Sequence, residues 1–166
     1  MTAELAMTPE RKSAWEHIEH TRIAFFATLS EANGFRARPL TTQKVESESR
    51  LWFFIARDGD LAQEIASNPR VMVTYTNEDD GFYAALTGTA KIVVDADKAR
   101  TMWSALDEAW FPGGPDDSNL ALVRVDVDHG EMWEPTTNKM IQFLSIAAAA
   151  VTHTTPKAEG VHRTLM

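Results

Sequence analysis

The chain has 166 residues, of which 44% are hydrophobic and 24% charged, as expected of one globular domain with a sizeable core. Its net charge of −8 argues against broad binding to nucleic acid or to anionic membranes, and the absence of cysteine excludes disulfides and thiolate chemistry. No apolar stretch approaches the roughly 18 residues of a membrane span. The polar N-terminus is unlike a signal peptide, so we expect a cytoplasmic protein.

The first predicted element is a helix, preceded by flexible residues 1–7. Thr8 provides an N-cap hydroxyl and Pro9 suits the first helical position, so we expect the helix to run to about His20. Three residues at helical spacing form its inner stripe: Ala14, Trp15 and Ile18.

A hairpin follows, with strands Ile23–Leu29 and Phe35–Thr42 around a loop at Glu31–Gly34. Pro39 lacks an amide donor and therefore suits a strand edge or a bulge. Arg36 and Arg38 are two residues apart, which places both guanidiniums on one face of the strand.

The next stretch, Leu51–Arg57, is an apolar run rich in aromatic residues and reads as a buried strand. A strand beside fixed, bidentate cations is what a flat cofactor with a phosphate tail requires. The alternative is that Arg36 and Arg38 are solvated edge residues beside ordinary core. The residues alone favour this second interpretation.

Alternating helices and strands continue the chain. Asp58–Asp60 caps a short helix, Leu61–Ser67, which is followed by strands Val71–Thr76 and Phe82–Val94. Gly88 in the second of these strands indicates a bulge or a close backbone approach.

Asp95 then caps a helix predicted over Ala96–Leu106, with four residues on its buried side: Ala99, Met102, Trp103 and Leu106. Two separate strands, Leu120–Val127 and Gly130–Trp133, precede an alanine-rich helix over Met140–Val151 and a flexible tail, residues 153–166. Strands outnumber helices, which predicts a small antiparallel barrel with attached helices in a single domain, residues 1–166.

Motifs for catalysis are absent. The sequence has no nucleophile elbow, G-x-G-x-x-G or P-loop, and His129 near Glu131 lacks partners at metal spacing, so we predict no metal site and assign no catalytic residue. Trp52, Trp110 and Trp133 lie near strand ends or loops, where an aromatic ring can face a cleft. Each alone is more often core, but with the arginine pair they would suit an isoalloxazine ring.

The order of these features resembles the general stress protein 26 group of the pyridoxamine 5′-phosphate oxidase-like, flavin-binding split barrels. The likeness covers roughly residues 10–150, and no single piece of it is specific. The matching pieces are 36–40 (RARPL), 51–55 (LWFFI), 64–71 (EIASNPRV), 83–90 (YAALTGTA), Trp103, 109–117 (AWFPGGPDD), 122–125 (LVRV) and 131–133 (EMW).

The resemblance implies a six-stranded antiparallel split β-barrel that forms a homodimer and holds FMN, or alternatively FAD, in two clefts between protomers. Arg36 and Arg38 would contact the phosphate or the ring. Two strands would line the isoalloxazine largely through their backbones, and two tryptophans would approach from the partner or close the cleft. The strand residues are Pro39, Leu40, Thr41, Trp52, Phe53, Phe54 and Ile55, and the tryptophans are Trp110 and Trp133.

One departure separates the chain from these relatives. Gly59 and Leu61 stand where relatives commonly place a serine and a lysine as a second phosphate anchor. The loss of a lysine contact removes ~1.5–3 kcal/mol of binding free energy. Arg36 and Arg38 would then hold the phosphate, with Lys44 or Arg57 as further candidates.

Two functions therefore stay open: an FMN-dependent oxidoreductase of unknown substrate, or a non-enzymatic dimer that has lost flavin or sequesters it. Haem is a third, weaker option. It would need a histidine near the mouth of the barrel, and only His129 is a candidate. Activity on pyridoxamine 5′-phosphate itself is not expected.

Overall fold

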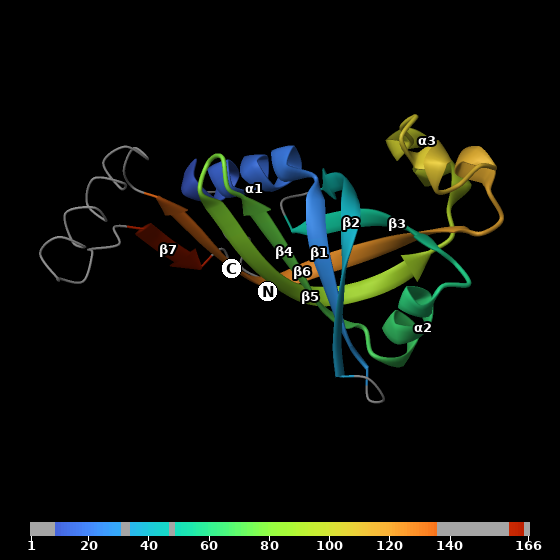
Figure 1. Ribbon diagram of the computed structural model, residues 1–166, viewed down its shortest axis with the longest axis horizontal. Helices are drawn as coiled ribbons and strands as arrows, with labels where there is room; N and C mark the ends of the chain where they lie inside the picture. The colour runs from blue at the N-terminus through green and yellow to red at the C-terminus, as the bar shows by residue number, and fades with distance from the viewer. Residues whose placement is uncertain (1–8, 31–33, 47–48, 136–159, 165–166) are drawn as a thin grey trace, which may run out of the picture.

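The computed structural model describes residues 9–30, 34–46, 49–135 and 160–164, and its main feature is a closed antiparallel barrel (Figure 1). The strands lie in the order β3-β2-β1-β4-β5-β6, and pairing of β3 with β6 closes the barrel. The predicted six-stranded barrel with attached helices is confirmed. Its strands are β1 Ile23–Ser30, β2 Gly34–Glu46, β3 Arg50–Ala56, β4 Arg70–Asn77, β5 Phe82–Val93 and β6 Leu120–Pro135.

The barrel core follows from alternation along the strands. On β1, Ala24 and Phe26 are buried while Phe25 is exposed, and on β4, Val73 and Tyr75 are buried while Met72 is exposed. Successive strand residues point to opposite faces, so one face of each strand fills the barrel and the other lies outside. The two faces predicted for β4 are therefore confirmed.

Two helices add apolar side chains to the barrel core. α1 (Pro9–Thr21) buries its predicted inner stripe, and α2 (Asp60–Ser67) buries Leu61, Ala62 and Ile65 in the same cluster. Figure 1 shows the two helices on opposite sides of the barrel. In the described part of the chain, no helix has the length and apolar character needed to cross a bilayer.

The strand β3 is buried on both faces. Leu51, Phe53 and Ile55 point into the barrel core, whereas Trp52 and Phe54 pack in a second cluster on the outer side. That second cluster is completed by Ala99 and Met102 on α3 (Ala96–Met102), by Phe111 in the following segment, and by Leu120 and Leu122 at the start of β6. The buried aromatic strand is confirmed, and its side chains are used for packing.

The helix predicted to reach Leu106 ends four residues earlier, at Met102. Trp103, the residue after the helix, has an extended backbone. The Asp107 side chain accepts hydrogen bonds from both the amide and the hydroxyl of Ser104, and Asp107 is the first residue of the 3-10 turn η1 (Asp107–Ala109). Leu106 is consequently 72% exposed, so its predicted burial is wrong. The cap is as predicted, since the Asp95 side chain accepts a bond from the Lys98 amide. A second 3-10 turn, η2, covers Gly114–Asp116.

Gly88 marks a β-bulge, as predicted. The β5–β6 register shifts between Thr87 and Gly88, and Asp128 has no partner in that register. A Cβ atom on Gly88 would overlap the Asp126 carbonyl and lie 3.0 Å from the Val127 Cα, so only glycine allows this close approach. The two strands predicted on either side of this point are one strand, β6, because the bulge bends the strand without ending it.

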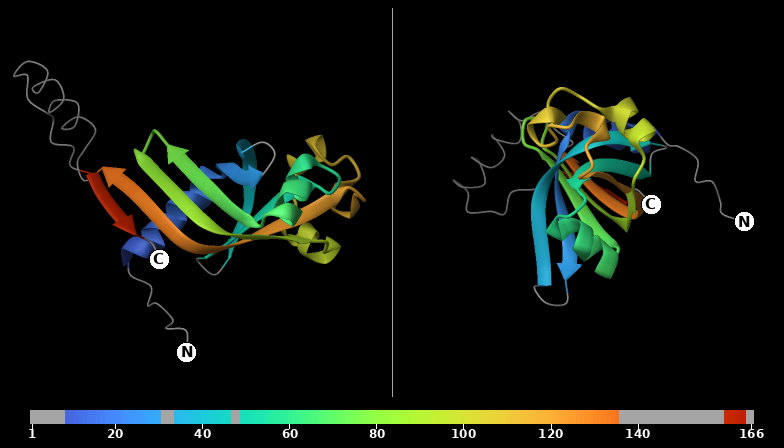
Figure 2. Two further views of the ribbon diagram at one scale, coloured as in Figure 1. Left: turned by 90° about the horizontal axis from the view of Figure 1, so that it is seen from below. Right: turned by 90° about the vertical axis from the view of Figure 1, so that its right-hand side faces the viewer.

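A seventh strand, β7 (Gly160–Thr164), pairs with the C-terminal end of β6, as the left view in Figure 2 and the left side of Figure 1 show. The sequence placed these residues in a tail and did not predict this strand. The loop at Glu31–Asn33, the N-cap Thr8 and the helix at Met140–Val151 lie outside the described residues.

Candidate functional site

The barrel is split beside the first half of β2. This strand pairs with β1 from Gly34 to Thr41, but its pairing with β3 covers only Thr42 to Glu46. Among the described residues, the first half of β2 therefore has a strand on one side only. Pro39 lies in this half, at a sheet edge, as its missing amide predicted.

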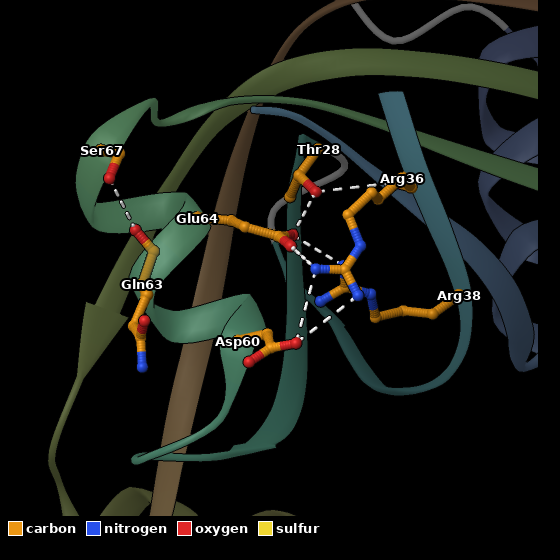
Figure 3. A network of polar contacts seen from close by, with 7 residues as sticks. All are labelled: Thr28, Arg36, Arg38, Asp60, Gln63, Glu64 and Ser67. Atoms are coloured by element: carbon orange, nitrogen blue, oxygen red, sulfur yellow. Dashed lines mark hydrogen bonds and ion pairs between the residues drawn. The ribbon is translucent and has the colours of Figure 1, made fainter. Parts of the chain in front are cut away.

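Both predicted arginines extend from this edge to α2 and converge on one carboxylate (Figure 3). Arg36 Nη1 lies 2.7 Å from Glu64 Oε1, and Arg38 Nη2 lies 2.6 Å from Glu64 Oε2. The prediction that both guanidiniums share one face is correct. The arginines are partly buried ion-pair partners, with side chains 41% and 23% exposed, and not solvated edge residues.

Two further groups complete this cluster, which we call the arginine–glutamate cluster (Thr28, Arg36, Arg38, Asp60 and Glu64). The buried Thr28 hydroxyl donates to Glu64 Oε2 at 2.5 Å. Asp60 is largely exposed and lies 3.4 Å from Arg36 Nη1. The cluster thus links β1, β2 and α2 across the split.

Glu64 is the centre of this arrangement. Its side chain is only 8% exposed, and burial by itself raises the pKa of a carboxyl group. The Thr28 hydroxyl, Arg38 and Arg36 outweigh that effect and hold the pKa of Glu64 below its usual value. Glu64 is therefore an anion in the folded protein at neutral pH.

Sequence reasoning missed Glu64 and Asp60, although a signal was present. Glu64 lies between Leu61 and Ile65 on the face of α2 that enters the core. A carboxylate on an apolar helical face needs a cation or several donors there, because an unpaired buried charge is strongly unfavourable. The two arginines on one strand face are the cations that meet this need.

The predicted β3 residues do not offer side chains to a ligand. Trp52, Phe53, Phe54 and Ile55 are each 7% exposed or less. Trp52 also donates to Glu46 Oε2 at 3.0 Å, and the Lys98 ammonium lies 4.1 Å from the centre of its ring. A contact between β3 and a flat ring would have to use the backbone, as the resemblance implies.

The two remaining tryptophans are not brought together within one chain. Trp110 follows η1 and is 81% exposed, and Trp133 on β6 is 38% exposed. The segment between α3 and β6 and the C-terminal end of β6 lie at opposite ends of the molecule (Figure 1). A shared cleft would therefore need Trp110 of one chain and Trp133 of another.

The outside of the barrel carries an exposed apolar surface across β1, β2, β4, β5 and β6. The strand register places Leu29 opposite Phe35 and Tyr83 opposite Trp133. We call this surface the outer apolar face. Its side chains are between 38% and 81% exposed, and they are Ile23, Phe25, Leu29, Phe35, Met72, Tyr83 and Trp133. An exposed apolar surface spread over neighbouring strands is typical of an interaction site.

A family model described as pyridoxamine 5′-phosphate oxidase like matches residues 9–157. The chain belongs to this family. Among solved structures, a general stress protein 26 from Jannaschia sp. CCS1 is 26% identical, with a TM-score of 0.74, over 95% of this chain and 98% of that one. A general stress FMN/FAD binding protein from Xanthomonas citri is also 26% identical, with a TM-score of 0.69, over 79% of this chain and 93% of that one.

A curated protein of similar sequence is protein bli-3 of Neurospora crassa, 24% identical over 110 residues. That match covers 61% of this chain and spans about half, 53%, of the length of the Neurospora protein. The predicted resemblance to the general stress protein 26 group is thus confirmed, and relatives in the family are described as flavin-binding.

Within the described ranges, no group of three or more histidine and acidic side chains could hold a metal ion. His129 lies 3.6 Å from Glu131 on the exposed end of β6, with its side chain 48% exposed. The register shows that this pair lies on the outside of the barrel. His129 is opposite Thr87 on β5, which is only partly buried, whereas the next residue on β5, Leu86, is buried in the core.

Proposed function

We propose that this protein binds flavin, with FMN as the first candidate and FAD as the second. The observation that carries the proposal is the likeness of the whole barrel to the FMN/FAD binding protein of Xanthomonas citri, which covers 79% of this chain. The binding residues are those that the resemblance implied, namely the arginine pair, the edge of β2 from Pro39 to Thr41, and the backbone of β3.

The chemistry of the split fits a flavin in part. The exposed half of β2 offers backbone groups that no neighbouring strand occupies, which suits the polar edge of a planar ring. Arginine is the side chain best shaped to bind phosphate in a bidentate manner. Both guanidiniums already contact Glu64, however, and this limits what they can give to a phosphate.

We propose that the working form is a homodimer, with the outer apolar face as its interface. The face includes Phe25 and Phe35, 56% and 81% exposed, and extends to Trp133 on β6. A second copy would cover these side chains and could place Trp110 of one chain and Trp133 of the other at the same cleft, which one chain cannot do. Two equivalent clefts then follow from the twofold symmetry of such a dimer.

Bound flavin supplies one- or two-electron chemistry, while the protein provides orientation and electrostatics. The oxidoreductase hypothesis and the sequestering hypothesis differ only in whether the bound flavin turns over. Adding a nicotinamide reductant to the loaded protein separates them: bleaching of the flavin absorbance favours an oxidoreductase, and an unchanged spectrum favours sequestration.

The visible spectrum of the freshly purified protein, followed by FMN titration with fluorescence quenching, tests the proposal. Flavin bands or saturable quenching at micromolar protein support it. A colourless protein that ignores excess FMN and excess FAD overturns it.

A charge-matched pair of double variants locates the site. Arg36→Ala/Arg38→Ala removes the guanidiniums that the resemblance places against the phosphate or the ring and is expected to weaken quenching. Arg70→Ala/Arg100→Ala removes two exposed arginines elsewhere and is expected to leave quenching unchanged. Circular dichroism shows whether each variant keeps its fold. Equal quenching by both variants would move the site away from the arginine pair.

A further inference from the structure

The arginine–glutamate cluster has no net charge. Arg36 and Arg38 contribute two positive charges, and Glu64 and Asp60 contribute two negative ones. A phosphate monoester carries between one and two negative charges at neutral pH, and its attraction to a site depends on the positive charge that the site has left over. This cluster has none left over.

Glu64 meets the arginines as a phosphate would. Each of its two oxygens accepts a charge-assisted bond from a different guanidinium, at 2.7 and 2.6 Å. Phosphate oxygens take the same kind of bond from the same nitrogens. A ligand phosphate would therefore meet guanidiniums whose positive charge a carboxylate already balances.

The carboxylate is held too firmly for a phosphate to displace it. The Thr28 hydroxyl binds Glu64 Oε2 from inside the barrel, and the Glu64 side chain is 8% exposed, so it cannot turn out into water without moving α2. Displacement would leave a buried anion without its cations, which is strongly unfavourable.

We propose that Glu64 is a built-in substitute for the ligand phosphate, so that this site binds flavin with little preference for its phosphate group. The inference rests on the proposed flavin binding. It assigns Glu64 as a residue that determines specificity: flavins with and without a phosphate, FMN and riboflavin, bind with similar affinity.

The test compares FMN with riboflavin on the unmodified protein and on two variants, by fluorescence quenching. On the unmodified protein the two dissociation constants are expected to agree within about threefold. Glu64→Gln keeps the shape of the side chain and frees positive charge, so it should tighten FMN about tenfold or more, as expected for one added charge-assisted contact, while riboflavin stays within about threefold.

Asp126→Asn is the matched control. Asp126 also lies between two arginines, with 2.9 Å to Arg50 Nε and 2.8 Å to Arg124 Nη2, but on the outer side of β3 and β6. It changes the total charge by the same amount as Glu64→Gln. We expect it to leave both dissociation constants unchanged, which separates a local effect from a general change in charge.

Two results would overturn the inference. One is a preference of the unmodified protein for FMN over riboflavin of about a hundredfold, which needs no variant and so holds even if Glu64→Gln fails to fold. The other is a folded Glu64→Gln that binds FMN no more tightly than before.

Failure of flavin binding itself has a different signature. If neither flavin quenches with any variant, the proposed function fails, and inorganic phosphate then tests the cluster alone. Millimolar phosphate should raise the unfolding temperature of Glu64→Gln and leave that of the unmodified protein and of Asp126→Asn unchanged. No shift in any of the three proteins would overturn the assignment of Glu64 as well.

Discussion

Replacing Thr28 with valine tests the interior support of the arginine–glutamate cluster. Thr28 is 1% exposed, and its hydroxyl donates to Glu64 Oε2 at 2.5 Å. Valine has nearly the same shape, so the substitution removes the hydroxyl without opening a cavity. The carboxylate keeps Arg36 and Arg38 but loses its donor from the barrel.

The expected loss follows from the kind of bond removed. A hydrogen bond to a charged group contributes ~1.5–3 kcal/mol to stability. For a domain of this size, 1 kcal/mol lowers the unfolding temperature by about 2–4 °C, so Thr28→Val should lower it by about 3–12 °C at neutral pH.

The effect should depend on pH in a direction that the structure fixes. The Thr28 bond lowers the folded-state pKa of Glu64 below the ordinary value of 4.5. A group with a depressed folded-state pKa stabilises the protein fully above its unfolded-state pKa, and that stability is lost as the pH falls through the folded-state value. The difference between Thr28→Val and the unmodified protein should therefore be constant near neutrality and shrink in acid.

Thr42→Val is the control for this pH dependence. Thr42 is also buried, and its hydroxyl bonds to the Tyr75 hydroxyl at 2.7 Å, a pair that stays neutral because burial raises the pKa of Tyr75. Its loss should cost about 1–3 kcal/mol at every pH. Urea unfolding of the three proteins from pH 7 into the acid range measures both effects. A Thr28→Val loss that follows the Thr42→Val loss in acid would refute the charged bond to Glu64.

Three further substitutions test other parts of the molecule. Gly88→Ala should destabilise the barrel by about 1–3 kcal/mol in urea unfolding, because its Cβ would overlap the backbone of β6. Gly59→Ala should cost less, because the closest atom to its Cβ would be the Ala56 carbonyl oxygen at 3.3 Å. Glu46→Gln should lower the stability of the protein at neutral pH, and this difference should disappear as the pH falls to about 2. The reason is that hydrogen bonds from Lys98 and Trp52 lower the pKa of Glu46 to about 2. Thermal unfolding as a function of pH measures this difference. Phe25→Glu should convert the proposed dimer to a monomer in analytical ultracentrifugation, and Ala66→Glu, on the exposed side of α2, should not; equal sedimentation of the two variants would argue against the outer apolar face as the interface.

The sequence predicted the barrel well because its strands carry their own signal. The alternation of apolar residues along β1 and β4 requires one buried face and one outer face. This pattern alone identifies which face of the sheet points into the barrel. Gly88 was informative for a related reason, since glycine inside a long apolar strand has few explanations other than a close approach. The continuity of β6 through the bulge could not be predicted, because His129-Gly130 has the composition of a turn.

The candidate site was predicted less completely, because its partners are distant in the chain. Arg36 and Arg38 lie 28 and 26 residues from Glu64, and the split between β2 and β3 decides that they meet. Alternation placed both arginines on one face but could not say what that face meets. The roles of Trp110 and Trp133 are harder still, because they depend on a surface that one chain does not contain.

The departure seen in the sequence at Leu61 and the cluster seen in the structure both affect the charge of the same site. Every cation of the cluster comes from β2, and both anions come from α2, whose Leu61 is buried in the core where relatives commonly place a lysine. A lysine at position 61 would leave the cluster with one excess positive charge, which a ligand anion could match. With Leu61 and Glu64, α2 itself matches the arginines, and the cluster is electrically complete before any ligand arrives. If flavin is the ligand, we therefore expect the phosphate, and not the flavin ring, to contribute less to binding in this chain.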